Sequence, residues 1–275
     1  YRGASAPLHA AQADICPIPV DDEGLNVEYG RTHFPDARMI FVTPSHQMPL
    51  GMTMSLQRRM ELLAWAQEKQ TWILEDDYDS EYRFSGAPLA SLQSLDRHGR
   101  VIYVGTMSKV LFPGLRLGYM VAPANLVDSL VQAKSIIDKH TAIVPQMVLA
   151  DFIAEGHFGR HIKRMRKVYA ERQRVLVETI ESELSDELRC GAKDGGMDIA
   201  VFFKKNWSEQ RIIDEGAARS LELRGLAHYA HAERNTEHLP HASGLLLGFS
   251  SMDSTAIRQG LMVLKEILTG HLNKT

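Results

Sequence analysis

Three short apolar segments, each followed at once by polar residues, restrict the fold of this chain more than any other feature. They occupy residues 39–42, 71–74 and 101–104 and read MIFV, TWIL and VIYV. Stretches with helical periodicity separate them, and strands that alternate with helices form largely parallel sheets. Open sheets of this kind bind ligands beyond the carboxyl ends of their strands. The sequence therefore predicts an α/β fold with a binding site in these three loops.

The segment after the first strand predicts a helix with a defined start. Ser55 has the small hydroxyl side chain that helix N-caps favour, and we expect the helix to run from it to about Gln70. Leu56, Met60 and Leu63 recur at helical spacing, so we expect them to share one apolar face of this helix.

The pattern of elements divides the chain in two. Residues 1–157 are predicted to form one large domain, and residues 158–275 a connecting helix with a small α+β domain, because short strands and helices alternate after the helix. The further elements expected are a strand at 117–121, a helix from Pro123 or Asn125 to about Lys139, a long helix at 158–184, and strands at 197–203 and 244–250.

Lys109 follows the third strand, in the stretch GTMSKVLFPGLRLGY at residues 105–119. A lysine amine that is buried loses part of its preference for the charged form and can condense with an aldehyde. The hydroxyls of Thr106 and Ser108, with the guanidinium of Arg116, can hold a phosphate. An amine, hydroxyls and an arginine together fit pyridoxal 5'-phosphate (PLP), which carries an aldehyde and a phosphate on one ring. Taken alone, the same residues also fit a solvated loop.

A second motif, WILEDDYDSEYRF at residues 72–84, favours the PLP interpretation. PLP needs a carboxylate opposite its pyridine nitrogen, because the protonated ring is its electron sink. It also needs a donor near its phenolic oxygen. Asp76 and Tyr78 lie two residues apart where the strand ends, so they are expected to point to the same side. An isolated acidic cluster would be read as a polar exit from a strand, but the two motifs in this order support a cofactor site.

Four strings of this chain resemble the MocR subfamily of GntR-type bacterial transcription regulators. They are TPSHQMPLG, EDDYDSEYR, YVGTMSKVLFPGLRLGY and FIAEGHFGRHIKRMR, and they span Thr43 to Arg166. Members of that subfamily join an N-terminal winged helix-turn-helix to an aminotransferase-like domain. The resemblance implies the PLP-dependent transferase fold type I, which is similar to aspartate aminotransferase. This fold has a large domain with a mostly parallel sheet and a small α+β C-terminal domain.

The resemblance also gives each motif residue a role. Lys109 would be the catalytic residue and carry the cofactor as an internal aldimine. Asp76 would pair with the pyridine nitrogen, and Tyr78 would bind the phenolic oxygen of the ring. The other cofactor contacts would be phosphate binding by Thr106, Ser108 and Arg116, and ring stacking by Tyr1.

By the same resemblance, the chain is expected to sense an effector. An amine or amino acid would displace Lys109 from PLP, or PLP itself would be the signal. A homodimer is expected, with DNA contacted only through an N-terminal winged helix-turn-helix absent from this chain. A genuine aminotransferase is the alternative, although Leu246 occupies the position where such enzymes place an arginine for the substrate carboxylate. A third reading is a folded remnant that binds no cofactor and mainly dimerises.

The composition limits the class of protein but does not identify a function. Hydrophobic and charged residues make up 44% and 24% of the chain, as in ordinary globular proteins, and the net charge of −3 gives no basic footprint for nucleic acid. Cys16 and Cys190 are far apart and show no metal or disulfide spacing, which favours a cytoplasmic setting. No segment is apolar over the length of a membrane span. His157 and His161 have a metal-ligand spacing but no third ligand, so no metal site is expected.

Overall fold

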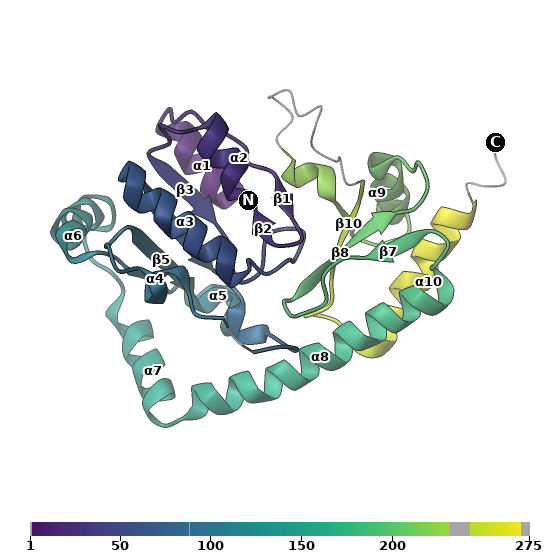
Figure 1. Cartoon of the computed structure of the whole chain (residues 1–275). Helices are drawn as coiled ribbons and strands as arrows, with labels where there is room; N and C mark the ends of the chain where they lie inside the picture. The colour runs from purple at the N-terminus through teal and green to yellow at the C-terminus, as the bar shows by residue number, and fades with distance from the viewer. Residues whose placement is uncertain (1, 88, 231–242, 271–275) are drawn as a thin grey trace.

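Two four-stranded sheets organise the chain, and a two-stranded hairpin precedes them. The computed structural model describes residues 2–87, 89–230 and 243–270. The first sheet has the order β3-β4-β5-β6, and the second has the order β7-β8-β10-β9. Figure 1 shows the two halves joined along one side by the long helix α8 (His157–Glu183), which starts within one residue of its predicted position.

The first sheet is mostly parallel, as predicted. Its strands are β3 (Met39–Val42), β4 (Trp72–Asp77), β5 (Val101–Thr106) and β6 (Gly118–Val121), and only β6 pairs antiparallel. The smaller elements around it are α1 (Arg2–Ala10), β1 (Val20–Asp21), β2 (Gly24–Leu25), α2 (Val27–His33), η1 (Ser80–Tyr82), α4 (Leu92–Leu95), α5 (Met107–Val110) and η2 (Pro113–Leu115).

Strand β4 runs past the apolar residues that predicted it. It was expected to end at Leu74 but continues to Asp77. The reason is that Asp76 and Asp77 stay paired in register with Val104 and Gly105 of β5. These acidic residues therefore lie on the strand itself, where neighbouring side chains point to opposite faces.

Helix α3 (Leu56–Lys69) begins and ends as predicted, but its buried face was predicted wrongly. The Ser55 hydroxyl accepts a backbone N–H of the first turn, and Gln70 ends the helix in a left-handed conformation. Leu56 and Met60 are 52% and 50% exposed, so only Leu63 of the predicted apolar stripe reaches the core. The face that does so consists of Arg59, Leu62, Leu63, Trp65 and Ala66.

Arg59 belongs to this face because the surrounding backbone satisfies its guanidinium. It donates hydrogen bonds to the carbonyls of Pro44, Met54 and Ala90 at 2.8, 3.1 and 3.1 Å. It also lies 4.0 Å from the carboxylate of Glu75, and neither side chain is exposed. Glu75 in turn accepts two backbone N–H groups of α4, at 2.9 and 2.8 Å. One buried ion pair thus ties α3, β4, α4 and the loop after β3 together.

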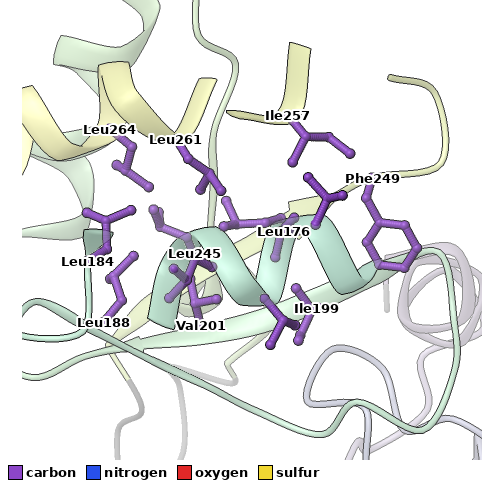
Figure 2. Close-up of a cluster of buried hydrophobic side chains, with 14 of the residues drawn as sticks. Leu176, Leu184, Leu188, Ile199, Val201, Leu245, Phe249, Ile257, Leu261 and Leu264 are labelled. Atoms are coloured by element: carbon purple, nitrogen blue, oxygen red, sulfur yellow. The ribbon is translucent and has the colours of Figure 1, made fainter. Parts of the chain in front are cut away.

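The second half is built on an antiparallel sheet covered by two helices. Figure 2 shows its core, with side chains of α8, the sheet and α10 (Ser254–Gly270) pointing toward one another. Val201, Leu245 and Phe249 have no exposed surface there. The strands and remaining elements are β7 (Leu188–Cys190), β8 (Asp198–Phe203), α9 (Glu209–Ala218), β9 (Arg224–Gly225), η3 (Leu226–Tyr229) and β10 (Gly244–Gly248).

The segment between the two halves exposes much apolar surface. It comprises α6 (Ala124–Asp138), close to the predicted helix, and α7 (Ile143–Ala154), and neither helix has a buried residue. Ile136 and Ile137 are 81% and 80% exposed. Within the described residues, no helix combines the length and the apolar character needed to cross a membrane.

Arg59→Met is expected to lower the free energy of unfolding by about 2–4 kcal/mol. Buried carbonyls would lose their donor and Glu75 its buried cation. Urea denaturation at neutral pH measures the change. Arg31→Met is the matched control, because Arg31 pairs with Glu68 at the surface and its loss should cost less than about 1 kcal/mol. Equal stability of Arg59→Met and the parent protein would contradict the role given to this pair.

Candidate functional site

The carboxyl ends of β3, β4 and β5 bring three polar loops to one edge of the first sheet. Val42 pairs with Glu75, and Asp76 pairs with Val104, so the parallel strands end side by side. The loop at residues 43–51, the residues after β4 and the short helix α5 therefore lie next to one another. This edge gathers the acidic, phenolic, hydroxyl and amine groups of the predicted site.

Asp76 stands apart from the other acidic residues of this edge. Among the described residues, its carboxylate has no hydrogen-bond partner. The neighbouring carboxylates all have partners. Glu75 accepts the backbone N–H groups of Leu92 and Gln93, and Asp77 accepts the hydroxyls of Tyr103 and Ser80. Asp79 forms its hydrogen bond with the ring of His46. Burial, followed by the charges of Asp77 and Asp79, raises the pKa of Asp76 to about 6. A carboxylate in this state is a ready site for a cation.

Tyr78 lies one residue beyond β4 and is held by His46. Its hydroxyl is 3.0 Å from His46 Nδ1 and donates to the His46 carbonyl at 3.0 Å. Burial, followed by the charge of Asp79, raises the pKa of Tyr78 well above its usual range. The phenol is therefore neutral at physiological pH and remains a hydrogen-bond donor.

His46 and Asp79 were not predicted as site residues. His46 Nδ1 lies 2.9 Å from Asp79 Oδ2, and both side chains are buried. Burial is the largest influence on the pKa of His46 and acts to lower it, but the charge and hydrogen bond of Asp79 outweigh it, so the pKa is raised. The sequence signal was the histidine in the string TPSHQMPLG, which has no apolar neighbour on either side.

The loop at residues 43–51 also contacts the second half of the chain. A Cβ on Gly196 would come within 2.2 Å of the His46 ring, and Gly196 has a φ of +91° that favours glycine. Met48 and Leu50 pack against a cluster formed by Ala200 and Leu246 of the second sheet and Leu226 of η3. The site therefore lies where the two sheets meet.

The groups proposed to hold a phosphate lie at the end of β5 and after it. The Thr106 hydroxyl caps α5 by accepting the Ser108 N–H at 3.1 Å. Arg116 is exposed and has a left-handed backbone with φ of 49°.

Lys109 lies on α5, but its side chain is exposed, because none of the described segments packs over its amine. This exposure differs from the buried amine expected from the sequence. Tyr1 lies outside the described residues.

The two histidines with metal-ligand spacing do not converge on a site. His157 Nε2 lies 3.1 Å from a carboxylate oxygen of Glu155, whereas His161 Nε2 lies 3.0 Å from the carbonyl of Val110. In the described part of the chain, no group of three or more His, Cys, Asp or Glu side chains could hold a metal ion.

Comparison with known proteins matches residues 13–222 to the family model described as aminotransferase class I and II. The chain is 40% identical to the probable rhizopine catabolism regulatory protein MocR of Rhizobium meliloti, over 96% of this chain and 52% of that protein. It is 31% identical to the pyridoxine biosynthesis transcriptional regulator PdxR of Corynebacterium glutamicum, over 88% of this chain and 50% of that protein. The chain thus spans about half the length of these curated relatives.

A solved structure agrees with the fold. LysN, the α-aminoadipate aminotransferase of Thermus thermophilus complexed with N-(5'-phosphopyridoxyl)-L-leucine, superposes with a TM-score of 0.89. It is 28% identical, and the match covers 100% of this chain and 70% of that one. The predicted PLP-dependent transferase fold of type I is confirmed, as is the resemblance to MocR-type regulators.

Asp79→Asn is expected to lower the pKa of His46, because the carboxylate that most opposes the effect of burial is lost. With the folded pKa raised, the pair stabilises the fold below pH about 6.5, and this contribution disappears as pH rises through the folded pKa. NMR titration of the imidazole protons gives the pKa directly. Asp194→Asn is the control and should cause a smaller decrease, because Asp194 contributes less. An unchanged His46 pKa in Asp79→Asn would refute the pairing.

Proposed function

The chain belongs to the class I and II aminotransferase family, and from this premise we propose that it is the PLP-binding, effector-sensing domain of a transcription regulator. The observation that carries the proposal is the 40% identity to MocR, which extends over 96% of this chain. The cofactor is PLP, in keeping with the family and with the phosphopyridoxyl compound in the LysN structure.

The residues of the site fit PLP. Asp76 has a partly buried carboxylate without a hydrogen bond to any described residue, and burial, followed by the charges of Asp77 and Asp79, raises its pKa to about 6. A protonated pyridine nitrogen beside it would compensate its charge. When bound, PLP supplies an aldehyde that bonds to primary amines and a protonated ring that withdraws electrons.

Each remaining site residue has a role that its chemistry supports. Lys109 presents an exposed primary amine on α5, accessible for bonding to the aldehyde. Tyr78 offers a neutral phenol, oriented by His46, to the phenolic oxygen of the ring. The residues that would bind the phosphate are Thr106, Ser108 and Arg116, and Tyr1 would stack on the ring.

The position of the site supports sensing. A ligand shifts a conformational equilibrium only through different affinities for the two conformations. The loop at residues 43–51 contacts both sheets, so a ligand that replaces Lys109 on PLP can favour one arrangement of the halves over another. The effector is a small amine or amino acid, or PLP itself. The pyridoxine-related name of PdxR, 31% identical to this chain, supports the last possibility.

Several further properties belong to the same proposal. The domain division lies between residues 157 and 158, at the start of α8. The protein is a cytoplasmic homodimer, and the exposed apolar side chains of α6 and α7 support such an association. DNA is contacted through a winged helix-turn-helix outside this chain.

A genuine aminotransferase is the second candidate, favoured by the structural match to LysN. Against it stands Leu246, which is buried with 3% exposure where such enzymes place an arginine. Repeated turnover of an amino acid and a keto acid would establish the enzyme. Exchange of amines on PLP without keto product would support the sensor.

Reduction with borohydride in the presence of PLP is expected to leave a phosphopyridoxyl group on Lys109. The primary amine of Lys109 is the group that the motif offers to the aldehyde. Peptide mass spectrometry identifies the modified residue. Lys109→Ala is expected to lose this adduct and keep its circular dichroism, whereas Lys139→Ala, a change on the exposed surface, is expected to keep both. A folded parent protein without an adduct would instead support the third alternative, a folded chain that binds no cofactor and mainly dimerises.

Asp76→Asn is expected to weaken PLP binding about tenfold or more, because a neutral amide cannot compensate a pyridinium charge. Equilibrium dialysis gives the dissociation constant, and absorbance reports the protonation of the ring. Asp96→Asn is a matched control away from this edge, where the carboxylate accepts backbone N–H groups after α4. Unchanged affinity together with an unchanged spectrum in Asp76→Asn would show that this residue does not face the nitrogen.

A further inference from the structure

Asp198 lies on the face of the second sheet that turns toward the loop at residues 43–51. It begins β8, and Ala200, two residues on, shares its face and belongs to the cluster that packs against Met48 and Leu50. Opposite Asp198 in the sheet is Gly248, where an added Cβ would meet no atom of the described residues within 4 Å. In the described part of the chain, the position beside Asp198 on this face is therefore unfilled.

The Asp198 carboxylate has no hydrogen bond or ion pair with any described residue, although it is partly buried. Burial raises its pKa, and the charges of His46, Lys109 and Arg224 act in the opposite direction. Those cations come from the loop at residues 43–51, from α5 and from β9. Asp198 is thus within electrostatic reach of the proposed amine-bonding site, which it approaches from the second sheet.

Leu246 gives the same face an apolar character. It lies on β10 opposite Ala200 and next to the strand position of Asp198, with 3% exposure. An arginine there would favour a ligand carboxylate. The face instead combines the buried Leu246 with the carboxylate of Asp198, so the ligand meets a negative charge where an arginine would present a positive one.

We propose that Asp198 selects effectors that carry a second ammonium group, so that the ligand class is an aliphatic diamine. This inference rests on the proposed function. One amine nitrogen of the ligand bonds to the aldehyde carbon of PLP while the bond from that carbon to Lys109 Nζ breaks, and two amine protons pass to Lys109. The other ammonium pairs with Asp198, and the methylene chain lies against Leu246.

Arg224 is the competing determinant. It is paired opposite Leu246 across the sheet and would favour a carboxylate instead. Its side chain is exposed, whereas Asp198 is partly buried, and charge pairs at exposed positions contribute less than those shielded from water. This difference in burial favours the ligand's ammonium over a ligand carboxylate.

The test uses the full-length protein loaded with PLP and three ligands of equal chain length: 1,4-diaminobutane, butylamine and 4-aminobutanoate. Calorimetry gives the dissociation constants, and cofactor absorbance reports bonding. We expect the diamine to bind about tenfold more tightly than either other ligand. Asp198→Asn should bind the diamine and butylamine about equally, while Asp186→Asn, an exposed control, should keep the preference.

Two results overturn the proposal alone. One is equal affinity for all three ligands, and the other is a preference for 4-aminobutanoate that disappears in Arg224→Ala. In both, the phosphopyridoxyl group still forms on Lys109 after borohydride reduction. Absence of that group in the loaded protein overturns the proposed function as well, because the ligand then has no aldehyde to meet.

Discussion

The parallel register of β3, β4 and β5 is the constraint on which the rest of the structure depends. It makes three strands end side by side, so residues distant in sequence share one edge. The buried pair of Arg59 and Glu75 then fixes the first loop, because Arg59 donates to the carbonyl of Pro44 at the start of that loop. A shift of one residue in this register would turn Asp76 to the opposite face of the sheet.

The contact between the loop at residues 43–51 and the second sheet couples the site to the relative position of the two sheets. His46 is wedged against Gly196, and its ring also holds Asp79 and Tyr78. A change at the Tyr78 hydroxyl therefore acts on a residue packed against both halves. Packed contacts of this kind tend to switch between discrete arrangements rather than deform gradually. The geometry suits a ligand-dependent shift of one sheet against the other.

Local patterns were predictable from the sequence, whereas partners distant in sequence were not. Ser55 signals a helix start by its own chemistry, and the apolar segments signal strands. The burial of Arg59 in place of Leu56 depends on three carbonyls supplied by other segments. The motif likewise predicted Asp76, but its difference from Asp77 depends on hydroxyls of Tyr103 and Ser80. The exposure of Lys109 depends on which segments pack over it, which no local pattern specifies.

Two carboxylates without hydrogen bonds to described residues belong to the two sheets that meet at the site. Asp76 lies on the first sheet beside the proposed cofactor, and Asp198 on the second beside the proposed effector. Burial raises the pKa of both, so each charge is costly until a cation meets it. In the proposed complex the cofactor would compensate Asp76, whereas Asp198 would still lack a hydrogen-bonded cation, although the charges of His46 and Arg224 act on it. A ligand with a second ammonium can bridge from the first sheet to the second, so its affinity depends on how far apart the sheets are. That dependence is what a sensor requires, because a ligand shifts only those conformations that it binds unequally.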